Sequence, residues 1–134
     1  MTRTLGPAPS IAEMEAMAEA ALARIPAGFA AHLGDVVIAV EDFAEDDLLV
    51  EMGIESPFEL TGVYEGLPLT ERSIEHSGTM PDRVRLFRLP ILLEWCELGD
   101  ETLEHLVAHV LVHEIGHHFG LSDEDMHALE EMAG

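Results

Sequence analysis

Five residues near the C-terminal end of the sequence have the types and spacing of a metal-dependent hydrolytic centre: His113, Glu114, His117, Gly120 and Asp123. An α-helix turns by about 100° per residue, so His113 and His117 lie about 40° apart in azimuth and one turn apart along the axis. Both imidazoles can therefore reach one ion. Glu114 lies about 60° beyond His117, where it is better placed beside a water on the ion than as a third helical ligand.

The third ligand is expected from the residues that follow this helix. Gly120 is the residue type that ends a helix and permits a reversal, after which Asp123 can direct a carboxylate back toward the ion. Asp123 also suits the first turn of a following helix, where the helix dipole favours an acid. Glu124 and Glu130 are the alternative third ligands. Two imidazoles and one carboxylate leave zinc a fourth position for water, which is the pattern of a catalytic zinc site.

These residues predict hydrolysis of an amide bond. Zinc lowers the pKa of its bound water to about 7. Glu114 would act as the catalytic general base, taking a proton from that water and handing it to the leaving amine. The expected cofactor is therefore Zn²⁺, with His113, His117 and Asp123 as metal ligands.

The other histidines are interpreted as structural. His105 and His109 extend the four-residue ladder, and His109 with His113 is an alternative metal pair. The helical drift rotates His105 away from the metal side, so both are read as polar positions on the helix. His118 lies on the side of Glu114, where it lines the cleft or serves as a partly exposed structural residue. No motif surrounds the remaining three, His32, His76 and His127.

The whole segment resembles the zincin metallopeptidases, in particular the small bacterial zinc peptidases whose motif reads His-Glu-x-x-His-x-x-Gly-x-x-Asp. Upstream, residues 62–72 resemble that family's Gly-Leu-Tyr-Glu-Gly-x-Pro-Leu-Thr-x-Arg loop, and Val84 to Pro90 resembles the strand leading to its active-site helix. The resemblance implies a minimal zincin of α+β class, with a small mixed β-sheet packed on the active-site helix and short helices around. It also implies a zinc-dependent metalloprotease, a hydrolase acting on a peptide or protein substrate.

Two further expectations come from the way zincins bind peptides, as an added strand along a sheet edge near the zinc. Arg83 to Leu89 is the candidate edge, or else a strand that is merely half buried. Tyr64 and Arg72 are candidate donors to a tetrahedral oxyanion, which needs such donors opposite the metal. Alternatively, Tyr64 belongs to the core and Arg72 pairs with an acid.

Two other functions compete with the peptidase. One is a zinc-binding protein or interaction module with little turnover. The other is a metal-dependent endoribonuclease, since one bacterial family of that class also clusters histidines on a helix, but its third His follows the Asp, where this chain has Glu124. The charge opposes any nucleic-acid or anionic-membrane partner, because 27 acidic residues face 6 basic ones, the net charge is −21 and Lys is absent.

Apolar periodicity and turn residues predict the elements that position the site. Ser10 and Glu13 have the spacing of a capping box. Helices are expected over residues 11–25, 44–52, 90–95, from about 101 to 119 with Asp100 as cap, and over 122–132. Strands are expected over 36–40, buried on both faces, and over 83–89, with short strands among the loops between them.

Length and composition predict a flexible N-terminus over residues 1–9 and a single domain over residues 10–134. Cys96 is the only cysteine, so no intrachain disulfide can form, and its apolar setting suggests a buried position. The N-terminus lacks the apolar core of a signal peptide, and no stretch is long and apolar enough for a membrane span. A cytoplasmic location is therefore expected, whereas the oligomeric state is not specified.

Overall fold

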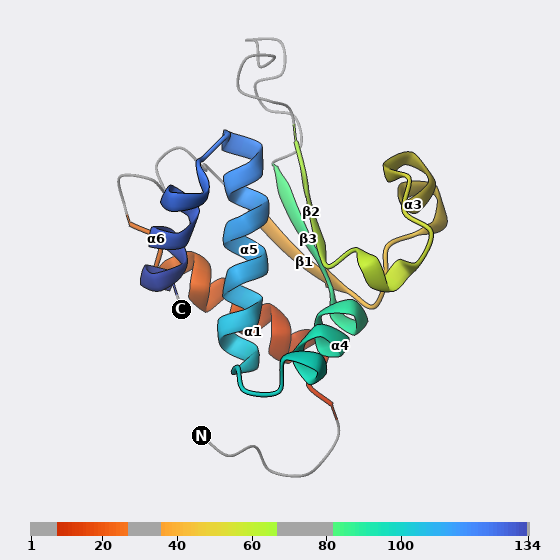
Figure 1. Ribbon diagram of the computed structural model, residues 1–134, viewed down its shortest axis with the longest axis horizontal. Coiled ribbons are helices and arrows are strands. Elements are labelled where there is room, and N and C mark those ends of the chain that lie inside the picture. Colours follow the sequence, from red (N-terminus) through yellow and green to blue (C-terminus); the bar gives the residue numbers. More distant parts are fainter. Residues whose placement is uncertain (1–7, 27–35, 67–81, 134) are drawn as a thin grey trace.

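The computed structural model describes residues 8–26, 36–66 and 82–133, apart from the side chains of residues 123, 132 and 133. Within these ranges five α-helices accompany a three-stranded mixed sheet, so the fold is α+β, as the sequence predicts (Figure 1). In chain order the elements are α1 (Ile11–Ala23), β1 (Val37–Glu41), α3 (Asp46–Met52), the 3₁₀ turn η1 (Pro57–Glu59), β2 (Gly62–Glu65), β3 (Arg83–Phe87), α4 (Arg88–Leu98), α5 (Leu103–Phe119) and α6 (Asp123–Ala133).

The strand β3 lies in the middle of the sheet. The order is β1-β3-β2, with β1 parallel and β2 antiparallel to β3. The prediction that residues 83–89 form a sheet edge is therefore wrong. The prediction that one face of this strand is exposed to water is wrong as well. Arg85 is only 4% exposed, because its guanidinium binds Glu41, Glu45 and Glu65 from three separate segments. Ion pairs, rather than water, satisfy that face of the strand.

The strand β1 is buried on one face only, which corrects the prediction that both faces are covered. Ile38 and Val40 point into the core, whereas Val37 is 45% exposed on the opposite face. The alternation follows from the two-residue period of a strand, because helices cover only the face that carries Ile38 and Val40.

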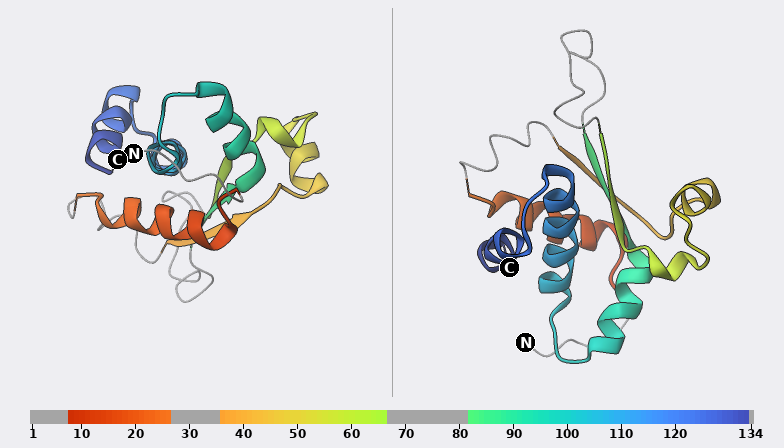
Figure 2. Two further views of the ribbon diagram at one scale, coloured as in Figure 1. Left: turned by 90° about the horizontal axis from the view of Figure 1, so that it is seen from below. Right: turned by 45° about the horizontal axis from the view of Figure 1, so that its top comes forward.

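The helix α1 begins at the predicted capping box. The backbone N–H of Glu13 donates to Ser10 Oγ over 3.1 Å, and the backbone N–H of Ser10 donates to Glu13 Oε1 over 3.0 Å. The helix crosses α5 on the inner side of the sheet, as the view along α5 shows (Figure 2), and buries Met14, Ala18 and Ala21 there. These residues cover the apolar side of α5.

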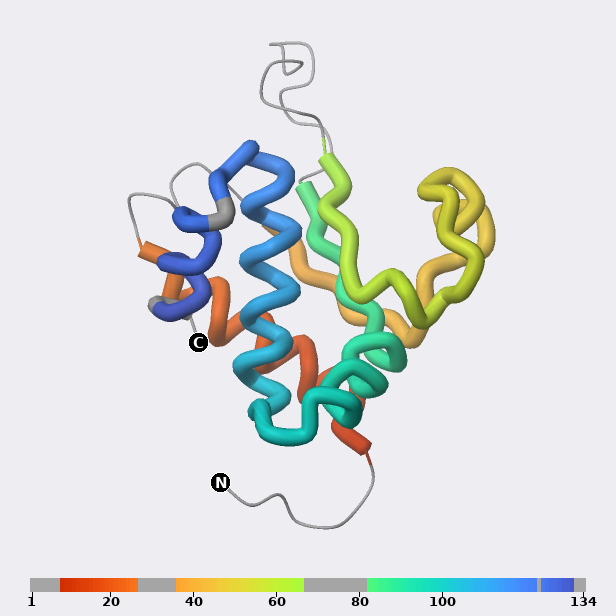
Figure 3. The backbone as a smooth tube through the Cα atoms, in the orientation of Figure 1, coloured from red at the N-terminus to blue at the C-terminus, as the bar shows by residue number. Residues whose placement is uncertain are grey.

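After α5 the chain turns back, and α6 lies beside α5 and is inclined to it (Figure 2 and Figure 3). Thr102 caps α5, since its Oγ1 accepts from the backbone N–H of His105 over 3.1 Å. The prediction that Asp100 caps this helix is therefore wrong. Leu103 is the first helical residue, because Thr102 has an extended backbone with φ −75° and ψ 150°.

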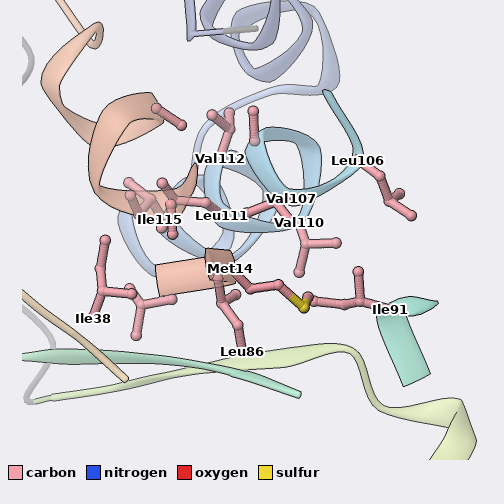
Figure 4. Close-up of a cluster of buried hydrophobic side chains, with 14 of the residues drawn as sticks. Met14, Ile38, Leu86, Ile91, Leu106, Val107, Val110, Leu111, Val112 and Ile115 are labelled. Carbon is pink, nitrogen blue, oxygen red and sulfur yellow. The ribbon is translucent and has the colours of Figure 1, made fainter. Parts of the chain in front are cut away.

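The core lies between α1, α5 and the inner face of the sheet (Figure 4). Val107, Leu111 and Ile115 of α5 are fully buried, and Met14 and Leu86 face them from α1 and β3. Burying each such side chain contributes about 2 kcal/mol. The side of α5 that carries this stripe is therefore held firmly, and the position of its histidines follows from it.

The helix α4 starts at Arg88, directly after β3, and carries Pro90 in its first turn, where proline is tolerated. Its buried residues are Pro90, Ile91 and Leu92 near its start, and Trp95 packs against the core one turn later. Cys96 lies beyond them and is exposed, so the prediction of a buried cysteine is wrong. No helix in the described part of the chain has the length and apolarity to cross a membrane.

Candidate metal centre

Two histidines lie side by side on the last turns of α5. The ring centroids of His113 and His117 are 4.8 Å apart, with the rings nearly perpendicular. The ring of His109 lies 5.0 Å from that of His113, so these three residues form a row along one side of the helix. His105 contacts Glu101 instead. The spacing argument thus describes the helix correctly, and ligation of zinc by His113 and His117 stays a prediction.

The chain reverses after α5 in the predicted way. Gly120 has φ +69°, in the left-handed region that glycine adopts at least cost, and its N–H donates to carbonyl groups of the last turn. The N–H of Leu121 then donates to the carbonyl oxygen of Gly116 over 2.9 Å. Ser122 caps the next helix, because its Oγ accepts from the N–H of Asp125 over 3.1 Å. Helix α6 therefore begins at Asp123.

The side chain of Asp123 lies outside the described residues, so the third ligand stays a prediction. Among the described side chains no three His, Cys, Asp or Glu residues converge as a metal-binding group. Of the two alternative ligands, Glu124 is exposed and Glu130 contacts His109 through Nδ1 of the imidazole. The helical repeat places residue 123 on the same side of α6 as Glu130.

Glu114 has the electrostatic setting of a general base. The side chain is half-buried, and this burial raises its pKa to about 7 from an ordinary 4.5 because the charged form loses hydration. Glu114 stands one turn before His118, whose ring stacks on Tyr64 of β2. Glu114 therefore lies on the side of α5 that faces β2.

A cluster of Tyr64, Asp82 and His118 joins the end of α5 to the sheet. The hydroxyl of Tyr64 donates to Asp82 Oδ2 over 2.8 Å, and its ring lies 3.9 Å from that of His118, almost parallel. Tyr64 also packs on the hydrophobic core. The core interpretation of Tyr64 thus fits better than that of an oxyanion donor, because its hydroxyl is engaged. Asp82 belongs to no sequence motif. Its position directly before a predicted strand is the only sequence signal that could have pointed to it.

Several predicted residues fall outside the described part of the chain. They are Arg72, His32, His76, most of residues 1–9 and the second half of the 62–72 motif. The residues that are described suit Zn²⁺, since imidazole nitrogens one helical turn apart are the donors that zinc prefers and a carboxylate can complete the set. Two imidazoles one helical turn apart, with a half-buried carboxyl group on the same helix, could serve metal-dependent hydrolysis.

The comparison with protein families agrees with this arrangement. Residues 33–133 match the family of zincin-like metallopeptidases, and the chain belongs to that family. The match confirms the resemblance seen in the sequence and implies zinc binding and hydrolase chemistry. It begins after α1, although α1 packs on α5. A search of curated proteins found no match.

Proposed function

We propose that the protein is a zinc-dependent peptidase that hydrolyses peptide bonds, with Glu114 as general base. The observation that carries the proposal is the placement of His113 and His117 one turn apart on α5, with the half-buried Glu114 between them in sequence. Membership of the zincin-like metallopeptidase family supports the class of reaction.

His113, His117 and Asp123 would hold the ion. Zinc, when bound, supplies a Lewis acid that lowers the pKa of water to about 7 and polarises a carbonyl group. Glu114 accepts the proton of the attacking water and releases it to the leaving amine nitrogen. In the metal-free chain burial raises the pKa of Glu114 to about 7, and a bound cation would lower it again and so favour the carboxylate that accepts the proton.

The substrate is proposed to add to the outer edge of β2. Of the described strands, β1 and β2 form the edges, and β2 is the one that packs on α5. Gly62 lies so close to α5 that an added Cβ would meet Val110 Cγ1 at 3.1 Å. An extended peptide on this edge would have its backbone hydrogen-bonded by β2 and would run along the side of α5 that carries Glu114.

The test compares Glu114→Gln with the wild type on a peptide library read by mass spectrometry, with zinc content measured on the same samples. Glu104→Gln is the matched control, because Glu104 is an exposed acid in the first turn of the same helix. We expect Glu114→Gln to retain zinc and to lose at least about 100-fold in kcat, while Glu104→Gln cleaves normally. Stoichiometric zinc without cleavage by the wild type would instead indicate a zinc-binding protein with little turnover. Protein without zinc would remove the site.

A further inference from the structure

Helix α6 is attached to α5 by two contacts of different kinds. Met126 is buried against Gly116, so closely that a Cβ on Gly116 would lie 2.3 Å from Met126 Sδ. One turn farther along α6, the carboxylate of Glu130 meets Nδ1 of His109. The Glu130 side chain is only 13% exposed, although it ends in a polar carboxyl group. The second contact joins residues that the proposed reaction does not use.

Both contacts lie on the side of α6 that includes residue 123. Positions 123, 126 and 130 are separated by three and four residues, which places them within about 60° of one another around the helix. His109 belongs to the row that continues through His113 to His117. The two contacts therefore fix the helix that presents Asp123 relative to the helix that presents the two histidines.

We propose that His109 and Glu130 are a positioning pair, which holds α6 at the angle that brings Asp123 to the zinc site. The inference rests on the proposed function, because it takes Asp123 as the third ligand. Met126 on Gly116 acts as the pivot, and Glu130 prevents rotation about it.

The distances of residue 123 and Glu130 from Met126 explain why the Met126 contact alone does not fix the position of residue 123. Residue 123 lies about 4.5 Å along the axis from Met126, and Glu130 lies about 6 Å along it in the other direction. A swing of about 1 Å at Glu130 thus moves residue 123 by nearly as much. Metal–ligand distances tolerate only about 0.2 Å, so such a swing would separate the carboxylate from the ion.

The pair is partly open to water, which makes the proposal testable. The His109 side chain is 42% exposed, so water screens its side of the contact, whereas the Glu130 side chain is 13% exposed and its variants need a separate check of folding. His105 and Glu101 provide the matched control, because they form the same kind of contact within one stretch of chain at the far end of α5. Replacing the control pair does not disturb α6.

The experiment measures zinc affinity by competition with a chromogenic chelator, together with the visible spectrum of the Co²⁺-loaded protein. The single variants are Glu130→Ala, Glu130→Gln, His109→Ala and Asp123→Ala. One double variant combines Glu130→Ala with His109→Ala, and the control combines His105→Ala with Glu101→Ala. Circular dichroism in the presence of a chelator verifies that each is folded. We expect Glu130→Ala and His109→Ala each to weaken zinc binding about tenfold, as loss of a supporting partner does.

Two further outcomes support the positioning role. The double variant is expected to be no weaker than either single one, because each removes the same contact. Glu130→Gln is expected to recover most of the affinity, since its amide oxygen still accepts from His109. The control pair should stay within about twofold of the wild type.

Three outcomes overturn the inference in distinguishable ways. If Glu130→Ala binds zinc normally while Asp123→Ala does not, the positioning role fails and the proposed function stands. If Glu130→Gln is as weak as Glu130→Ala and Asp123→Ala is normal, Glu130 is itself the ligand. If the wild type binds no zinc, the proposed function fails together with the inference.

Discussion

The burial of Glu114 should make the metal-free protein less stable in alkaline than in acidic solution. In the folded chain burial raises the pKa of Glu114 to about 7, whereas the unfolded value is 4.5. A group with a raised pKa contributes its full stability below the unfolded pKa, and this contribution is lost as the pH rises through the folded pKa. The change Glu114→Gln replaces the carboxyl group by a neutral one of similar shape and should abolish this loss.

The magnitude follows from the shift. A rise from 4.5 to about 7 is about 2.5 pKa units, and each unit corresponds to about 1.4 kcal/mol. The side chain is half-buried and water screens part of the effect, so we expect about 2 kcal/mol. Between pH 5 and pH 8 the wild type should lose this much free energy of unfolding relative to Glu114→Gln.

Urea unfolding at pH 5 and pH 8 measures the difference, with a chelator present and Glu104→Gln as the control. The wild type and Glu104→Gln should lose stability in parallel, while Glu114→Gln loses less. Addition of zinc should remove the difference, because a nearby cation favours the carboxylate form. Parallel behaviour of all three proteins without metal would refute the reasoning, since Glu114 would then be as well hydrated in the folded chain as in the unfolded one.

Other substitutions probe the sheet and the α5–α6 hairpin. Arg85→Met should cost about 2 kcal/mol in urea unfolding, because Glu41, Glu45 and Glu65 lose their shared cation. Side-chain hydrogen bonds from Arg85 lower the pKa of Glu45 to about 2. The stability that Glu45 contributes is therefore present above its ordinary pKa and is lost as the pH falls toward 2. Arg85→Met should reduce this loss of stability in acid, and an unchanged loss would contradict the assignment. Gly116→Ala should destabilise by about 1–2 kcal/mol despite its better helix propensity, because the new Cβ meets Met126, and Met126→Ala should relieve the clash. Gly120→Ala meets no neighbour and should cost about 1 kcal/mol through its positive φ alone, so Met126→Ala should not rescue it in the same urea unfolding experiments.

The site helix could be predicted from the sequence because its signals are local. The apolar stripe, the four-residue histidine spacing and the glycine stop all lie within one short segment and act through helix geometry. The capping box of Ser10 and Glu13 and the turn into α6 are local in the same way. The fold class followed from these elements together with the family resemblance.

The arrangement of the sheet could not be predicted because its signals are distant. Arg85 looks exposed within its own strand, since its partners Glu41, Glu45 and Glu65 stand 44, 40 and 20 residues away. The exposure of Cys96 could not be predicted either, because it depends on where the core lies relative to the second half of α4. The contact of Glu130 with His109 likewise joins residues 21 apart that carry no common motif.

The packing of α1 on α5 sets an order of events during synthesis. The helix that carries the histidines is covered by a helix made about ninety residues earlier, so neither can bury its apolar side until both have left the ribosome. Contacts of such large separation form late in folding. Because His113 and His117 lie on this same helix, we expect their positions to become fixed only once α5 has docked on α1.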